Sequence, residues 1–204
     1  MAGDRESPPA SGSDGPPVGT VEALCIAPES GAPADSRDAV EICPSGVDGD
    51  RYRRGEGHFQ LDGCPVTLVA AEAIEAVRAE AGIDISDGSH RRNVVVEGFG
   101  TGMDELLEAT VAVGNALLRP TRRRPPCAHL EQLTGTDGLA SALKRRGGLC
   151  CDVIDPGRVA VGDSVAIREA DPRTTGAAIA ERLQAQSSAG SADSVSDEDR
   201  TGER

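Results

Sequence analysis

The sequence predicts a β-rich α+β domain, in which short, mostly antiparallel strands and a few short helices form a barrel-like fold. Short runs of β-branched and other apolar residues recur along the chain, and each run ends at Gly, Pro, Asp or Asn. Sustained helical spacing of apolar residues occurs only in residues 71–81. A Gly–Asn pair at 114–115 joins two strand-like runs, which is typical of a tight hairpin.

The elements follow one another in a clear order. The helix in residues 71–81 has apolar residues at Ala73, Ile74, Val77 and Ala81, and Gly82 is a stop signal. The glycines after residues 128–134 and 137–146 predict two further short helices. Strands are expected in residues 18–27, 39–42, 64–70, 93–99 and 109–123, and three more within 149–167, where an Asp-Pro-Gly turn suggests a hairpin.

Both ends of the chain differ in composition from its middle. Residues 1–17 consist largely of Pro, Gly, Ser and Asp, which bury too little apolar surface to offset the entropy lost on ordering. Residues 171–204 have a similar character, apart from a short helix-like stretch. We therefore expect one folded domain over residues 18–170, flanked by a disordered tail and an acidic C-terminal extension.

The chain is strongly acidic, with 34 Asp and Glu against 21 Lys and Arg and a net charge of −13. This charge repels phosphate backbones and anionic lipid surfaces, and three aromatic rings are too few for a base-stacking platform, so we expect neither nucleic-acid nor membrane partners. Acidic surfaces stay hydrated at high salt, which suggests a halophilic protein. The lack of a long apolar run or a signal-like N-terminus predicts a cytoplasmic location.

Six cysteines are present, and none forms a C-x-x-C pair. In a cytoplasmic chain with a core of its own we expect most of them to be free thiols, and the scattered histidines argue against structural zinc. Cys150 and Cys151 are neighbours in a predicted strand, where successive side chains point to opposite faces. One of them should therefore lie in the core and the other should point outward.

The segment "RRRPPCAHLE", residues 122–131, gathers positive charge around Cys127. Nearby cations favour the thiolate, which is the nucleophile and metal ligand, and the two prolines stiffen the approach to the sulfur. His129 follows two positions later. The alternative is that Cys127 caps a helix and that the arginines form a solvated stripe on a strand.

Two other loops also carry arginines. "HRRN" places Arg91, Arg92 and Asn93 just before a strand, and "GDRY" places Asp50 and Arg51 after a glycine turn. Arginine holds phosphate or carboxylate in a bidentate manner, so the loops could converge on one anionic ligand. Taken singly, each loop could equally be a turn or a surface ion pair.

Read in order, "GVDGDRY", "CPVTLVAAEAIEAV", "RRNVVVEGF", "VAVGNALL", "RPPCAHLE" and "RGGLCCDVIDPGRVAVGDSV" resemble the MOSC domain family, named after the C-terminal domain of molybdenum cofactor sulfurases. The resemblance covers residues 21–167 and implies a barrel-like fold in a stand-alone member. It also implies binding of the molybdenum cofactor, in its molybdenum or tungsten form, or handling of sulfur for it.

The resemblance assigns roles to particular residues. The cysteine of the family's Pro-Cys motif falls on Cys127, which we expect to be catalytic and the metal ligand. The expected cofactor-binding residues are Arg51, Arg91, Arg92, Asn93 and Arg124. Tyr52 stands where members often have His, and His58 follows shortly after it.

Three functions fit this picture. In the first, which we prefer, Cys127 carries a persulfide sulfur from a separate cysteine desulfurase to the cofactor, with a molybdoenzyme as a candidate acceptor. In the second, Cys127 ligates the metal of an oxidoreductase that reduces N-hydroxylated compounds with electrons from a partner protein. The third is a non-enzymatic molybdopterin carrier. Direct binding of pyridoxal phosphate is disfavoured because the only lysine, Lys144, lies at a basic helix end.

Overall fold

A computed structural model describes residues 19–55, 64–107, 109–126 and 128–168. The predicted tail at residues 1–17 and the extension at 171–204 lie outside the described residues, as do Cys127 and His58. The described residues belong to a single unit that ends at Arg168. No helix in these ranges is long and apolar enough to cross a membrane.

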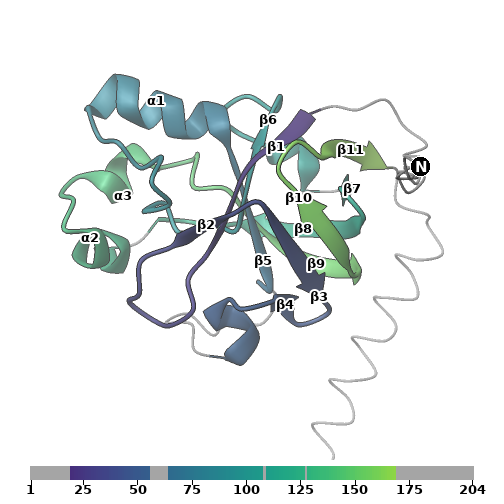
Figure 1. Cartoon of the computed structure of the whole chain (residues 1–204). Helices are drawn as coiled ribbons and strands as arrows, with labels where there is room; N and C mark the ends of the chain where they lie inside the picture. The colour runs from purple at the N-terminus through teal and green to yellow at the C-terminus, as the bar shows by residue number, and fades with distance from the viewer. Residues whose placement is uncertain (1–18, 56–63, 108, 127, 169–204) are drawn as a thin grey trace, which may run out of the picture. The chain divides into compact units, whose positions relative to one another are not determined.

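Seven strands close into a barrel, in the order β11, β7, β8, β9, β5, β6 and β1, with β1 pairing back to β11 (Figure 1). An eighth strand, β2, pairs with the last residues of β1. This confirms the predicted β-rich, barrel-like fold. The strands are β1 (Gly19–Ile26), β2 (Asp35–Arg37), β5 (Val66–Ala70), β6 (Val94–Glu97), β7 (Thr110–Val113), β8 (Ala116–Arg123), β9 (Leu149–Asp155) and β11 (Ser164–Arg168).

Most strand pairs are antiparallel, as predicted, but β5 and β6 are parallel. Between them runs α1 (Ala71–Ala81), because a parallel pair needs a crossover rather than a tight turn. The helix ends where predicted, with Gly82 at a φ of 68° and its N–H bonded to the carbonyl of Arg78. The predicted hairpin is also present, and Gly114 has the positive φ, 54°, that such short loops require.

A small second sheet contains β10 (Gly157–Ala160), β3 (Ala39–Cys43) and β4 (Gly46–Val47). The predicted hairpin across the Asp-Pro-Gly turn was wrong, because β9 belongs to the barrel whereas β10 pairs with β3. The turn therefore moves the chain from one sheet to the other. Two short strands, β2 and β4, were not predicted, since neither has an alternating apolar pattern of its own.

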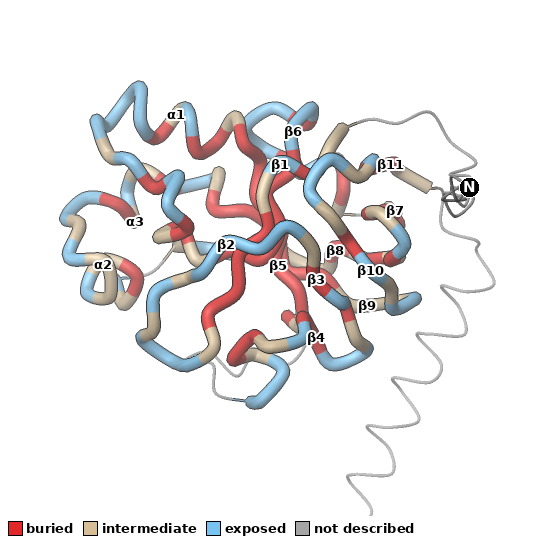
Figure 2. Tube along the Cα trace, in the orientation of Figure 1, coloured by how far each residue is buried: buried red, intermediate tan, exposed pale blue. Residues whose placement is uncertain are grey.

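The helices α2 (Ala128–Thr134) and α3 (Leu139–Ala142) lie with α1 on one side of the barrel (Figure 1). Figure 2 shows the buried residues concentrated along the barrel strands. All five residues of β5 are buried, because this strand lies in the barrel wall and also contacts α1. Two 3₁₀ turns, η1 (Arg51–Arg54) and η2 (Asp104–Leu106), complete the structure.

Candidate functional site

Asp50 is the buried centre of the first predicted motif, with a relative exposure of 1%. Its Oδ1 caps η1 by accepting the backbone N–H of Tyr52 at 3.0 Å. Its Oδ2 accepts the N–H of Ala27 at 3.0 Å and the side-chain amide of Asn93 at 3.2 Å. Arg51 lies 3.5 Å from the same oxygen. One carboxylate therefore fixes the turn that carries Arg51 and Tyr52.

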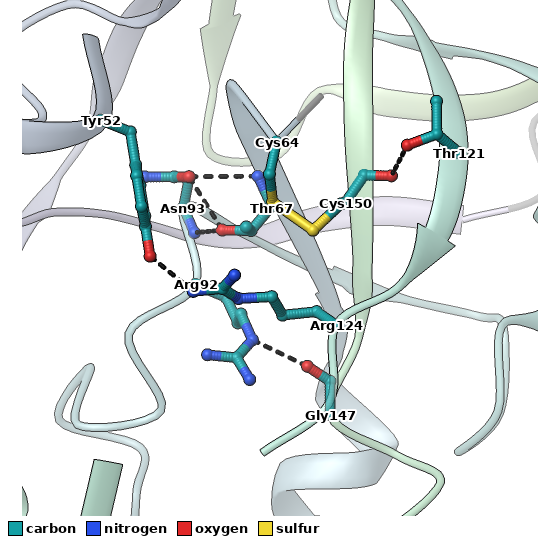
Figure 3. The surroundings of a disulfide bond; sticks show 9 residues. All are labelled: Tyr52, Cys64, Thr67, Arg92, Asn93, Thr121, Arg124, Gly147 and Cys150. Carbon is teal, nitrogen blue, oxygen red and sulfur yellow. Dashed lines mark hydrogen bonds between the residues drawn. A yellow bond between two sulfur atoms is a disulfide. The ribbon is translucent and has the colours of Figure 1, made fainter. Parts of the chain in front are cut away.

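Asn93 joins this turn to the barrel wall (Figure 3). Its Oδ1 accepts the N–H of Thr67 at 3.1 Å and the Thr67 hydroxyl at 2.8 Å. Its Nδ2 donates to Asp50 and, at 3.4 Å, to the carbonyl of Cys25. The oxygen and the nitrogen of the amide are thus both engaged inside the protein, which suits a residue that positions Asp50. Its predicted contact with a cofactor stays a prediction.

Arg92 is likewise buried and held by backbone carbonyls. Its Nε donates to Gly147 and its Nη1 to His90, both at 2.7 Å. The backbone N–H of Arg92 donates to Nδ1 of His90 at 3.0 Å. Burial lowers the pKa of His90 to about 3, and the positive charge of Arg92 acts in the same direction, so the imidazole is neutral and can accept this bond.

Two of the other three predicted arginines, Arg51 and Arg124, contact Tyr52, and the third, Arg91, donates from Nη1 to the carbonyl of Ala32. The Cζ of Arg51 lies 4.4 Å from the centre of the Tyr52 ring, and that of Arg124 lies 5.6 Å from it. Arg124 also donates from Nη2 to the Tyr52 hydroxyl at 2.5 Å (Figure 3). Burial and the nearby charge of Arg51 lower the pKa of Arg91. The structure thus brings three of the predicted loops together.

Arg51, Arg91, Arg124 and the ring of Tyr52 are called the Tyr52 cluster below. Within the described ranges, the only carboxylate that forms an ion pair with the cluster is that of Asp50. The cluster has more positive than negative charge and is only partly buried. It can therefore bind an anion with bidentate guanidinium groups.

The remaining arginines before Cys127 point elsewhere. Arg123 is exposed and forms a bidentate pair with Asp104, at 2.5 and 2.6 Å. Arg122 has a buried Nη2 without a hydrogen-bond partner in the described structure. His129 is half-buried in α2. Of the three arginines at positions 122–124, only Arg124 belongs to the Tyr52 cluster. Cys127 itself lies outside the described residues.

Cys25, Cys43 and Cys151, three of the five cysteines in the described ranges, are free thiols, in line with the expectation that most would be. The other two, Cys64 and Cys150, form a disulfide across 86 positions of sequence, which was not predicted (Figure 3). The prediction that one of Cys150 and Cys151 points outward was wrong: both have 0% exposure, because β9 is covered on both faces. Burial raises the pKa of Cys151, which keeps it protonated.

Sequence reasoning missed several residues that organise the site. Tyr52 was read only as a replacement for a histidine, although it is the chain's single tyrosine and follows Arg51 directly. Gly147 and His90 were read as a helix stop and as part of a turn. Gly147 is 55 positions from Arg92 in the sequence, and His90 is two positions from it. Only the contact with His90 is local enough to be predicted from the sequence. In the described part of the chain, no group of three or more His, Cys, Asp or Glu could hold a metal ion.

Comparison with solved structures identifies similar folds. YuaD from Bacillus subtilis has a TM-score of 0.63 at 20% identity, covering 75% of this chain and 97% of that one. YiiM from Geobacillus stearothermophilus has a TM-score of 0.57 at 16% identity, covering 74% and 75%. YiiM from Escherichia coli has a TM-score of 0.54 at 15% identity, covering 74% and 71%. At these identities the likeness shows the fold alone.

No curated protein matches the chain. The model of the MOSC domain, however, matches residues 47–166, which is more than half of the sequence. This range includes Asp50, the Arg-Arg-Asn motif and Gly147, which are connected in the structure, and it also includes Cys127. The chain therefore belongs to the MOSC domain family, which is associated with binding of the molybdenum cofactor.

Proposed function

We propose that this chain binds the molybdenum cofactor at the Tyr52 cluster and carries sulfur for it on the thiol of Cys127. The observation that supports this most directly is the contact of Arg51 and Arg124 with Tyr52, together with the electrostatic coupling of Arg91 to Arg51. Among the described residues, Asp50 is the one carboxylate paired with these three arginines, so two guanidinium charges have no carboxylate partner there. A phosphate monoester carries about −1.5 to −2 charge at neutral pH, so the terminal phosphate of a molybdopterin fits this surplus.

The lowered pKa of Arg91 supports the same reading. Burial and the repulsion from Arg51 both disfavour a second guanidinium at this position. The negative charge of a bound phosphate would offset the repulsion between Arg51 and Arg91, because each arginine could then donate hydrogen bonds to the phosphate oxygens. Two neighbouring guanidinium groups are better suited to binding an anionic ligand than to stabilising the fold. We infer that Arg51 and Arg91 hold the phosphate and that Arg124 closes the site from the side of Cys127.

Arg92 and Asn93 support this site indirectly. Their side chains are engaged by Gly147, His90, Thr67 and Asp50, so we infer that they fix the turns on which Arg91 and Arg51 lie. The sequence instead predicted that Arg92 and Asn93 contact the cofactor directly. The positioning role and the direct binding role are separable by experiment, because loss of a positioning residue lowers protein stability even in the absence of a ligand.

Cys127 is the reactive group of this proposal. It follows Arg124 by three positions, and Pro125 and Pro126 between them restrict the backbone. A thiolate is a soft donor that suits a thiophilic metal or an incoming sulfur atom. The bound cofactor would supply a metal centre that accepts sulfur. We infer that the Cys127 thiolate attacks the outer sulfur of a persulfide on a separate cysteine desulfurase, which forms a persulfide on Cys127 and releases the desulfurase cysteine as a thiolate.

The test is metal, pterin and labile-sulfur analysis of the protein purified anaerobically from a host that makes the cofactor. We expect bound pterin and a labile sulfur on Cys127, with the sulfur lost and the fold kept in Cys127→Ser. Cys43→Ser, which removes a free and partly exposed thiol, is the control. Absence of pterin and metal from the wild type would refute the proposal.

The same experiment separates the alternatives. Stoichiometric molybdenum or tungsten that disappears in Cys127→Ser, without any labile sulfur, would identify the thiol as a metal ligand and favour the reductase. Turnover of a hydroxylamine compound with a reduced viologen would support that result. Cofactor that is retained by both proteins, with neither sulfur nor turnover, would indicate a carrier.

A further inference from the structure

A cavity of about 160 Å³ lies where the end of β8 approaches the segment that follows α3. Residues 123–126 line it from the first segment, residues 144–145 and 147–148 line it from the second, and Gly102 is the remaining lining residue. We call it the Lys144 cavity. Pro126 is one of its lining residues and directly precedes Cys127 in the sequence. The cavity therefore adjoins the chain segment that carries the proposed reactive thiol.

The charge of this cavity is opposite to that of the whole chain. Four of its lining side chains are cationic, and none of the described residues that line it is Asp or Glu. Arg123 is neutralised by Asp104, whereas Arg124 bonds to the uncharged hydroxyl of Tyr52. Neither Lys144 nor Arg145 has a side-chain ion-pair partner among the residues that the structure describes. Unneutralised charge is thus concentrated here in a chain of net charge −13.

The two sides of the cavity are fixed to each other through backbone contacts. The N–H of Arg124 donates to the carbonyl of Gly148 at 2.7 Å. A Cβ on Gly147 would lie 2.4 Å from the carbonyl oxygen of Arg124 and 3.2 Å from Cδ of Pro126. The segments can approach this closely only because position 147 has no side chain. The two segments that line the cavity are therefore fixed relative to each other, so the cavity is preformed in the absence of a ligand.

The backbone conformation of Arg145 is unusual for a residue with a long side chain. Its φ is 68°, in the left-handed region that glycine and asparagine adopt far more readily than arginine. Arg146 follows, and Gly147 and Gly148 come after it, so residues without a side chain are present in this segment. The long cationic side chain of Arg145 instead lines the cavity.

We propose that the Lys144 cavity binds a small anion, of the size of sulfate or a short carboxylate. A volume of about 160 Å³ has room for roughly five water molecules at about 30 Å³ each, which suits an anion of four to six heavy atoms. Arg124, Lys144 and Arg145 supply the charge, and the rings of Pro125 and Pro126 supply apolar contact. The binding of the anion does not rest on the proposed function.

The experiment is a titration of the ¹⁵N-labelled full chain with sodium sulfate and, separately, sodium propionate at constant ionic strength. We expect saturable shifts at the amides of Gly147 and Gly148, and dissociation constants at least tenfold weaker in Lys144→Gln/Arg145→Asn. Asparagine is chosen because it tolerates a positive φ. Arg78→Gln/Arg158→Gln removes the same charge from exposed positions outside the cavity and should bind as the wild type does. Saturation by sulfate alone would identify an inorganic oxyanion, and saturation by propionate an organic carboxylate.

Several results would overturn the proposal. These are a lack of saturable shifts with both probes, equal affinity of the double variant, and shifts confined to Arg51 and Tyr52. Lys144→Gln alone, at an exposed position, provides a second variant should the double substitution unfold. Pterin content is measured in parallel: we expect it to be unchanged in the double variant, and its loss would assign the cavity to the cofactor. A wild type that binds the probes but contains no pterin would refute only the proposed function.

Discussion

Arg92 donates from Nε to the carbonyl oxygen of Gly147 at 2.7 Å, across 55 positions of sequence. The next residue, Gly148, accepts the backbone N–H of Arg124 at the same distance. Two adjacent glycines thus tie the Arg-Arg-Asn motif to the segment that leads into Cys127, and Figure 3 shows the bond between Arg92 and Gly147. The arginine loops meet because this glycine pair holds both of them.

Gly147→Ala should destabilise the protein by about 1–3 kcal/mol, the range for overpacking in a tight site. The added Cβ would lie 2.4 Å from the carbonyl oxygen of Arg124, so a backbone segment has to move. Urea unfolding measures the loss. Gly102→Ala is the matched control, because a Cβ there meets no atom within 4 Å, and it should change stability by less than about 0.5 kcal/mol. Equal stability of the two variants would contradict this packing.

Arg91→Asn should weaken retention of a phosphate-bearing cofactor by roughly 10- to 100-fold, since a hydrogen bond to a charged group contributes about 1.5–3 kcal/mol. Asparagine suits the φ of 58° at this position, so the fold should persist. Pterin content after dialysis is the readout. Arg54→Gln removes the same charge nearby, where the side chain turns towards the carbonyl of Pro28, and should retain the cofactor. Undiminished retention by Arg91→Asn would exclude Arg91 from the phosphate site.

The Cys64–Cys150 disulfide should appear as a linked peptide in a non-reducing digest. Both sulfurs belong to buried residues, with exposures of 7% and 0%, so dithiothreitol should reduce the bond slowly unless a denaturant is present. Cys64→Ser should lower the free energy of unfolding by about 2–4 kcal/mol, because the bond closes a long loop of the unfolded chain.

Cys43→Ser serves as the control for this prediction, since Cys43 is a free thiol at a partly exposed position. It should leave both the linked peptide and the stability nearly unchanged. The disulfide assignment fails if Cys64 and Cys150 are both alkylated in the denatured, unreduced protein.

Much of the fold could be predicted from local pattern. The helix in residues 71–81, the Gly–Asn hairpin and the barrel strands each have their own signal in spacing and turn residues. Pairing between distant segments has no such signal, which is why the transfer of β10 to the small sheet was missed. The disulfide was missed for the same reason, since Cys64 and Cys150 approach only after β5 and β9 have paired.

The candidate site was predicted in part. The arginine loops were expected to converge: Arg51 and Arg124 do meet at Tyr52, and the charge of Arg51 acts on Arg91. The inward direction of Arg92 could not be read from the sequence, because it depends on the carbonyl of Gly147. Residue type indicates what a side chain can bind, and only the packed structure shows which partners it already has.

His90 should make the protein sensitive to acid. Its imidazole is buried next to Arg92, and its pKa is lowered to about 3, whereas an unfolded chain has a histidine pKa of about 6.5. Between these values the unfolded state binds a proton that the folded state does not. His90 therefore does not reduce the free energy of unfolding above about pH 6.5. As the pH falls from about 6.5 towards 3, proton binding by the unfolded state lowers the free energy of unfolding by up to about 1.4 kcal/mol per pH unit.

The substitution His90→Asn removes this titration while offering Arg92 another acceptor. The free energy of unfolding, measured in urea between pH 7 and 4.5, should then fall less steeply with acid than in the wild type. Thr67→Val breaks the bonds of the same buried network to Asn93 without removing a titrating group, so it should lower stability at every pH and keep the wild-type slope. A His90→Asn protein with the wild-type slope would show that His90 is protonated in the folded state, and the neutral acceptor for the Arg92 N–H would have to be abandoned.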